Sequence, residues 1–118
     1  MNKPSQSFRE VVAWQKAHAF TLTVYRLTEG FPSHEAFGFT SQLRRAAASV
    51  PANFVEGFRK RTLPDKLRYY NMAQAFADEC LYHLILAHDL ICADTLAMQT
   101  ELEEVSRILQ GYINGMKR

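Results

Sequence analysis

Residues 42–57 read QLRRAAASVPANFVEG, a helical pattern with a proline, Pro51, in its middle. Apolar side chains recur at helical spacing on both sides of that proline, at Leu43, Val50 and Phe54. A proline inside a helix removes one backbone hydrogen bond and clashes with the carbonyl four residues earlier, which costs about 3 kcal/mol. Because the apolar stripe continues across Pro51, we expect one helix kinked at Pro51 rather than two helices.

The same stretch indicates how this helix packs. The ring of Pro51 should leave the carbonyl of Ala47 without its helical partner. Ser49 and Asn53 are placed to satisfy nearby backbone groups with their side chains. The small side chains of residues 46–49 allow a second helix to approach closely. We therefore expect a tight, bent interface between two helices at this point.

Three further helical patterns surround this stretch, and short breaks separate them. The expected helices span residues 8–29, 36–60, 63–92 and 95–115. Ser7 and Glu10 form a capping box before the first of them, and Thr62 with Pro64 forms the start of the third. Long helices with short connections favour antiparallel neighbours. The sequence therefore predicts an all-α fold, an antiparallel up-down-up-down four-helix bundle, in which residues 1–118 form a single domain.

The two cysteines, Cys80 and Cys92, are twelve residues apart. On one helix they would be separated by about 18 Å, whereas the Cα atoms of a disulfide lie within about 7 Å of each other. We expect both to be buried thiols in a reducing compartment. The first residues contain no apolar leader segment, and no apolar run reaches membrane-spanning length. These features predict a cytoplasmic protein without a membrane partner.

The charges are unevenly distributed along the chain. Residues 44–68 contain seven basic side chains and two acidic ones, whereas residues 69–106 contain seven acidic side chains and no Lys or Arg. The seven basic residues are candidate nucleic-acid contacts: Arg44, Arg45, Arg59, Lys60, Arg61, Lys66 and Arg68. Phe58 and Tyr69 flank this run and are candidates for stacking on bases. The alternative is that the charges only solvate two faces, or that the basic zone of one copy meets the acidic zone of another.

Motifs for catalysis and for cofactor binding are absent. The sequence has neither a Gly-x-Ser-x-Gly motif nor a glycine loop of the kind that cradles phosphates. A di-iron site in a helical bundle requires Glu-x-x-His, which does not occur here. His83 and His88 would lie about 140° apart around a helix, which is too far for one metal ion. Arg44 and Glu56 are expected to meet different helices. We predict no enzyme activity, no catalytic residue, no metal and no cofactor.

Four segments of the chain resemble a known family. They are FREVVAWQKAH at residues 8–18, GFTSQLRRA at residues 38–46, SVPAN at residues 49–53 and EGF at residues 56–58. They are similar to the ribosomal-RNA intervening-sequence protein family, and the likeness covers residues 7–110. This resemblance implies a four-helix bundle that assembles as a homopentamer and has no enzyme activity. It also suggests a connection with RNA, because some relatives are encoded inside intervening sequences of large ribosomal RNA genes.

Two hypotheses about function follow from these observations. In the first, a non-enzymatic oligomeric bundle binds RNA or a ribonucleoprotein through the basic residues. In the second, the protein is a protein–protein scaffold without nucleic-acid binding, and the same charges form contacts between subunits. Salt-sensitive RNA binding separates the two hypotheses, because contacts between basic side chains and phosphates weaken as the salt concentration rises.

Overall fold

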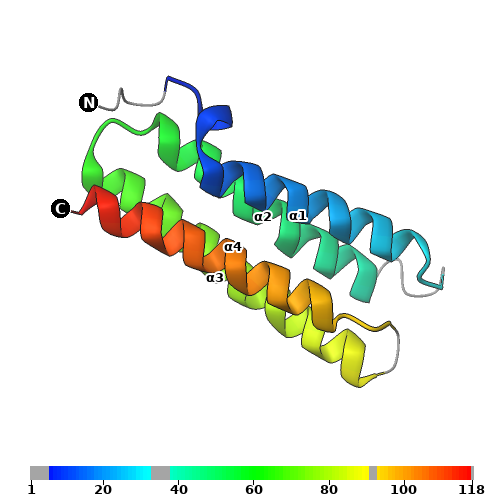
Figure 1. Cartoon of the computed structure of the whole chain (residues 1–118). Helices are drawn as coiled ribbons and strands as arrows, with labels where there is room; N and C mark the ends of the chain where they lie inside the picture. The colour runs from blue at the N-terminus through cyan, green and yellow to red at the C-terminus, as the bar shows by residue number, and fades with distance from the viewer. Residues whose placement is uncertain (1–5, 33–37, 91–92, 118) are drawn as a thin grey trace.

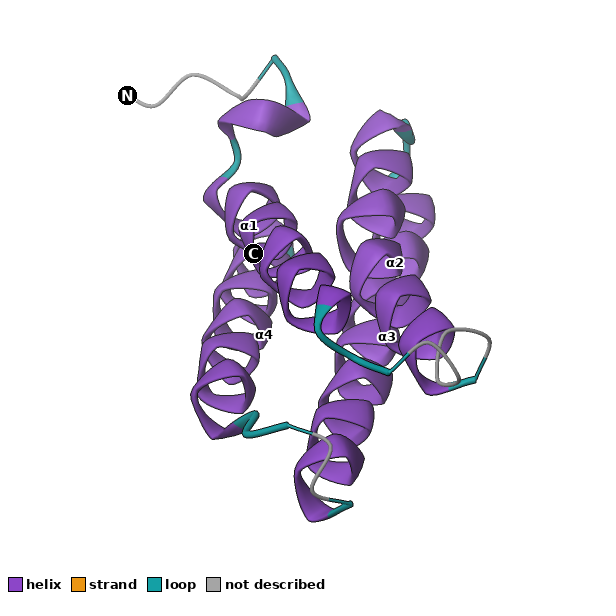
Figure 2. Ribbon diagram, turned by 90° about the vertical axis from the view of Figure 1, so that its right-hand side faces the viewer, coloured by secondary structure: helices purple, strands orange, loops and turns teal. Residues whose placement is uncertain are grey.

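The computed structural model describes residues 6–32, 38–90 and 93–117. A short 3₁₀ helix, η1 (Phe8–Glu10), precedes four α-helices, α1 (Val12–Glu29), α2 (Phe39–Arg59), α3 (Leu63–Asp89) and α4 (Leu96–Met116). The four helices lie lengthwise beside one another, as Figure 1 shows. Figure 2 contains helices and loops only, and no strand is present in the described ranges. The predicted all-α four-helix bundle is therefore confirmed.

Each helix contacts its neighbour in the chain, and α1 also contacts α4. The helix η1, the end of α4 and the α2–α3 connection lie at one end of the bundle, and the last turns of α1 and α3 lie at the opposite end (Figure 1). The antiparallel up-down-up-down order of the helices stays a prediction. All four helices contribute to the core, which includes Phe20, Leu43, Leu84 and Leu102. No described helix has both the length and the apolar character required to cross a membrane.

The beginning of the chain differs from the single helix expected over residues 8–29. After η1, Val11 adopts an extended conformation with φ −85° and ψ 123°, and α1 begins at the next residue. The Ser7 hydroxyl accepts a hydrogen bond from the backbone N–H of Arg9 at 3.2 Å, so Ser7 caps η1 rather than α1. The turn buries Val11 and places Phe8 edge-on against Trp14, with ring centroids 5.0 Å apart.

The other helices begin and end close to their expected bounds. The expected residues 36 and 37 of the second helix and 91 and 92 of the third lie outside the described residues. Thr62 caps α3 as the sequence indicates, because its hydroxyl accepts a hydrogen bond from the backbone N–H of Asp65 at 3.3 Å. Pro64 occupies the first turn of that helix, where its missing N–H has no intrahelical partner to lose.

Helix α2 runs through Pro51 without interruption. The carbonyl of Ala47 accepts a hydrogen bond from the hydroxyl of Thr21 in α1 at 3.1 Å, which replaces the partner that Pro51 lacks. The Ser49 hydroxyl donates to the carbonyl of Arg45, and the Asn53 amide donates to the carbonyl of Ser49. The backbone around the proline is thus satisfied by side chains. A bend of the helix axis at Pro51 stays a prediction.

Helices α2 and α3 pack closely at Gly57. A Cβ atom at this position would lie 2.7 Å from the ring of Tyr70, which is too close for any side chain. The ring of Tyr70 is fully buried and stacks on Phe54, with centroids 4.9 Å apart. The Glu-Gly step that ends α2 is therefore a packing feature, because only glycine allows this aromatic pair to fill the space between the helices.

Candidate functional site

The seven basic residues singled out in the sequence do not form one patch. Arg44 and Arg45 lie near the beginning of α2, whereas the other five lie at its end, in the α2–α3 connection and in the first turns of α3. Arg45 and Arg59 are separated by about 21 Å along α2, at a rise of 1.5 Å per residue. The two groups therefore occupy different parts of a molecule that is 49 Å long.

Arg44 is engaged in contacts with α1. Its Nε atom donates to the hydroxyl of Thr28 at 2.6 Å, and its Nη2 atom donates to the carbonyl of Tyr25 at 3.3 Å. The guanidinium also lies over the ring of Tyr25, 4.6 Å from the ring centroid. Because these acceptors lie in the last turns of α1, the positive charge is also placed favourably against the helix dipole. Arg44 thus joins two helices, as expected, and does not face solvent as a free cation.

Lys66 has a similar role at the end of α2. Its ammonium group donates to the carbonyl of Phe58 at 2.7 Å and lies 3.4 Å from the carbonyl of Gly57. These carbonyls belong to the last turn of α2, where helical partners are missing. The Lys66 Nζ atom also lies 5.5 Å from the centroid of the Phe58 ring. Partial burial lowers the pKa of Lys66. This lysine therefore caps a helix and is only partly available to a ligand.

The remaining basic residues of this group gather at one end of the bundle. We call this surface the basic end and define it by Arg59, Lys60, Arg61 and Arg68. Tyr69 lies among these side chains: the Lys60 Nζ atom is 4.9 Å, and the Arg68 Cζ atom 5.4 Å, from the centroid of its ring. The three arginines are exposed, and Lys60 is half-buried. The basic end therefore combines three exposed guanidinium groups with one half-buried aromatic ring.

The local sequence explains why these cations stay together. Helix α2 ends at Arg59, and Lys60 is extended, with its backbone N–H donating to the carbonyl of Gly57 at 3.1 Å. Two residues later Thr62 caps α3. The connection between the helices is thus short and held at both ends, so three consecutive basic side chains project from a defined turn.

The cations of the basic end form no close ion pair within the part of the chain that the structure describes. Within residues 6–32, 38–90 and 93–117, only two side-chain pairs bring a basic group within 4.0 Å of a carboxylate, and in both pairs the basic group is a histidine. They are His83 with Glu79 at 3.9 Å and His88 with Asp94 at 3.6 Å. No arginine or lysine of the basic end has a carboxylate partner among the described residues.

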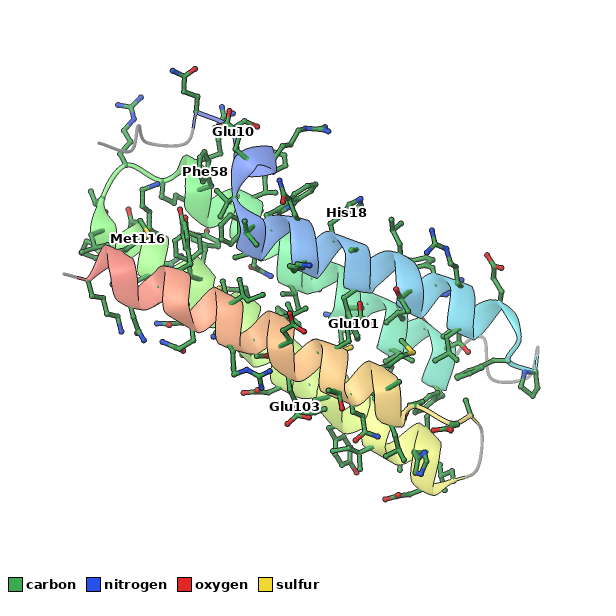
Figure 3. All side chains as sticks on the ribbon, viewed as in Figure 1. Glu10, His18, Phe58, Glu101, Glu103 and Met116 are labelled. Carbon is green, nitrogen blue, oxygen red and sulfur yellow. The ribbon has the colours of Figure 1, made fainter. Side chains whose placement is uncertain are left out.

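The acidic residues lie mainly along α3 and α4. Figure 3 places Glu101 and Glu103 on α4, whereas Glu10, Phe58 and Met116 lie at the end of the bundle that carries the basic residues. The end opposite the basic end exposes large apolar side chains. Tyr82, Leu90 and Leu96 are 60%, 61% and 56% exposed. Most acidic side chains and these three exposed apolar side chains therefore lie away from the basic end, in the part of the molecule that also carries the exposed Arg45.

The described residues contain no arrangement typical of catalysis or metal binding. No group of three or more His, Cys, Asp or Glu side chains in the described ranges is close enough to hold a metal ion. Cys80 is a buried free thiol, and burial, with a smaller effect of Glu79, raises its pKa to about 12. At neutral pH it is therefore protonated and a poor nucleophile. Cys92 lies outside the described residues.

Sequence reasoning missed two features of this surface. The sequence places Arg44 against another helix but does not indicate its acceptors at Thr28 and Tyr25, and no motif encodes the contact of Lys66 with the end of α2. A signal was present for Lys66, because it lies in the first turn of a helix that follows a short connection. The second feature is a groove beside Trp14, whose walls come from two different helices and from η1.

Fold and surface together define a small all-α bundle protein with a concentrated positive charge at one end. A family model described as 23S rRNA-intervening sequence protein matches residues 9–111. Because this match covers most of the chain, the chain belongs to that family.

A solved structure supports the fold. The chain is similar to a crystal structure of a protein of unknown function from the S23 ribosomal protein family of Bacteroides thetaiotaomicron, with a TM-score of 0.79 and 20% sequence identity. The match covers 87% of this chain and 96% of that chain. At this identity the likeness concerns the fold alone. Comparison with curated proteins gives no match.

Proposed function

We propose that this protein is a non-enzymatic, cytoplasmic homo-oligomer that binds RNA, alone or in a ribonucleoprotein, through its basic end. The observation that carries the proposal is the lack of carboxylate partners for Arg59, Lys60, Arg61 and Arg68 among the described residues. The three arginines are exposed, and Lys60 and Arg68 lie against the ring of Tyr69. Phosphate groups supply the missing countercharge, and arginine binds them with two hydrogen bonds at once.

The family supports a nucleic-acid partner in a general way. Its description refers to an intervening sequence of 23S rRNA. That description concerns the family and does not name a ligand of this chain. It favours RNA over other polyanions as the first partner to test.

Self-association is the second part of the proposal, with a homopentamer as the expected assembly. The exposed Tyr82, Leu90 and Leu96 support it, because large apolar side chains left in water are candidates for burial against a partner. Light scattering should give a mass five times that of the 13.5 kDa chain. A monomer mass at micromolar concentration would contradict this part of the proposal and leave RNA binding to be judged separately.

The alternative is a protein–protein scaffold that does not bind nucleic acid. The same exposed apolar side chains favour it, since each could be buried against a different protein as well as against a second copy. In that case the basic end would pair with acidic residues of a neighbouring subunit. Replacing its basic side chains by alanine would then change the mass of the assembly.

The two functions are separated by measuring RNA binding with matched variants. We expect Arg59→Ala/Lys60→Ala/Arg61→Ala to lose at least about tenfold in affinity for a labelled single-stranded RNA, because it removes three phosphate contacts. The control is Lys16→Ala/Arg26→Ala/Arg107→Ala, which removes the same charge from exposed positions elsewhere. Equal affinity of both triple variants, or no binding by the natural chain, would contradict RNA binding through the basic end.

A further inference from the structure

A groove between α1 and α2 opens close to the basic end. It has a volume of about 400 Å³. Phe8 and Arg9 from η1 and Trp14 and His18 from α1 form one wall. Ala52 and Val55 of α2 lie opposite. The packing of the bundle does not use this space, since His18 and Ala52 are exposed and Trp14 is only half-buried.

The aromatic wall is organised before any ligand arrives. The rings of Trp14 and His18 are nearly parallel, with an interplanar angle of 10° and centroids 4.9 Å apart. Phe8 packs edge-on against Trp14. The Gln15 amide donates to the carbonyl of Arg9 at 2.8 Å and so connects η1 to α1. These contacts hold a flat aromatic surface in place at the edge of the groove.

The charges around the groove are positive. Arg9 lines it, and its guanidinium lies over the ring of Phe8, 5.7 Å from the centroid. Arg59 follows Val55 by four residues on α2 and therefore lies on the same face of that helix, one turn closer to the α2–α3 connection. The lining includes no acidic side chain, although Glu10 and Glu56 are exposed next to it in the sequence. An anionic ligand with a flat, apolar part fits these features.

We propose that the groove accepts one base of a single-stranded RNA whose phosphates lie on Arg9 and the basic end. This inference rests on the proposed function and specifies the form of the RNA. Proteins that bind single strands combine a positively charged track with aromatic side chains on which bases stack. The volume is within the range of small-ligand pockets, about 300–1,000 Å³. A paired base in a duplex is stacked and cannot enter, so the groove selects unpaired RNA.

The chain contains a built-in reporter for this interaction, because Trp14 is its only tryptophan. Titration of the full chain with a single-stranded RNA should quench the fluorescence of Trp14. An abasic strand of the same length carries the same phosphates and should bind about tenfold more weakly, without quenching, since it cannot stack. The difference between the two strands isolates the base from the phosphate backbone.

Two variants test the position of the base. Ala52→Glu places a larger, negative side chain in the groove, and we expect its affinity for RNA to fall to that for the abasic strand. The control Ala75→Glu places the same group at an exposed position of α3 and should bind as the natural chain does. His18→Ala removes one ring from an exposed position and should weaken quenching without unfolding the bundle, which circular dichroism verifies.

The outcomes distinguish this inference from the function on which it rests. Equal, salt-sensitive binding of both strands with unchanged Trp14 emission would overturn the base site and leave RNA binding through the basic end intact. Binding of neither strand would overturn both. If Trp14 emission shifts on dilution without RNA, and Ala52→Glu lowers the oligomer mass, a second copy of the chain occupies the groove and the base site is likewise overturned.

Discussion

Thr21 and Pro51 lie on different helices, yet each has a role in the same hydrogen-bond arrangement. Pro51 leaves the carbonyl of Ala47 without a helical donor, and the Thr21 hydroxyl lies 3.1 Å from that carbonyl and 2.9 Å from the carbonyl of Ala17. The single hydroxyl proton is shared between these two acceptors. A buried carbonyl that loses its only donor costs about 1–3 kcal/mol.

We therefore predict that Thr21→Val lowers the free energy of unfolding by about 1–2 kcal/mol. The loss should be smaller in a Pro51→Ala background, because residue 51 then has an N–H that can donate to Ala47. Urea denaturation of the four chains measures this coupling. Thr23→Val is the control, since Thr23 bonds only to the carbonyl of Ala19 in its own helix. An equal loss in both backgrounds would contradict the arrangement.

Gly57 provides a second residue-level prediction. Gly57→Ala would place a Cβ atom 2.7 Å from the Tyr70 ring and 3.1 Å from the Cβ atom of Tyr69, so helices α2 and α3 must separate. We expect a loss of about 1–3 kcal/mol in the free energy of unfolding. Gly111→Ala in α4 meets no atom within 4 Å and should be neutral or stabilising, because alanine favours helix. Thermal denaturation of both variants and of the natural chain measures these changes. A Gly57→Ala protein as stable as the natural chain would contradict the close packing of Gly57 on Tyr70.

Burial of the Cys80 thiol makes the free energy of unfolding depend on pH in the alkaline range. In the unfolded chain its thiol ionises near pH 8.5, whereas burial raises the folded pKa to about 12. The contribution to stability is therefore complete below pH 8.5 and is lost as pH rises towards 12. Burial raises the pKa of Tyr70 also, which acts in the same direction at higher pH.

The free energy of unfolding should fall between pH 9 and 11, and Cys80 accounts for about 1 kcal/mol of that fall per pH unit. Urea denaturation of the natural chain and of Cys80→Ala over this range measures the contribution. The variant should lose stability less steeply with pH. Parallel curves for the two proteins would show that Cys80 is not protected from ionisation in the folded state.

Helix ends in this bundle are stabilised by basic side chains from neighbouring elements. Arg44 donates hydrogen bonds to the last turns of α1, and Lys66 donates one to the last turn of α2. The sequence identified both as candidate nucleic-acid contacts because it shows charge but not the distant backbone atoms that the charge meets. The neighbouring Arg45 is exposed and makes no side-chain contact of this kind among the described residues.

This difference predicts unequal effects for two adjacent substitutions. Arg44→Ala should lower the free energy of unfolding by about 1–3 kcal/mol, because charged hydrogen bonds are lost from a half-buried position. Arg45→Ala should change it by less than about 0.5 kcal/mol, as is usual for exposed positions. Denaturation in urea compares them under identical conditions. Equal effects would mean that the contacts of Arg44 with α1 do not stabilise the fold.

Much of the helical structure could be predicted from local patterns. The apolar stripe through Pro51, the cap at Thr62 and the first-turn Pro64 lie within a few residues of the features that they determine. The break at Val11 could not be predicted in this way, because the apolar pattern continues across it. The partner of Ala47 could not be predicted either, since Thr21 is 26 residues away in the sequence and meets it only when α1 packs on α2.

The whole molecule separates its charges along its length. The basic run is evident from the sequence, and the structure divides it into two capping residues, the exposed Arg45 and the four side chains of the basic end. The groove beside Trp14 was missed, because its walls come from residues more than thirty positions apart. The assembly of several copies stays a proposal that depends on surfaces outside the core.

The dependence of RNA affinity on salt concentration tests binding by the basic end most directly. The logarithm of the binding constant should fall linearly with the logarithm of the salt concentration, with a slope of about −0.7 for each single-strand phosphate contacted. We predict that Arg59→Ala/Lys60→Ala/Arg61→Ala makes this slope shallower by about 2, while Lys16→Ala/Arg26→Ala/Arg107→Ala leaves it unchanged. A natural chain without salt dependence, or the same slope in all three proteins, would contradict the account.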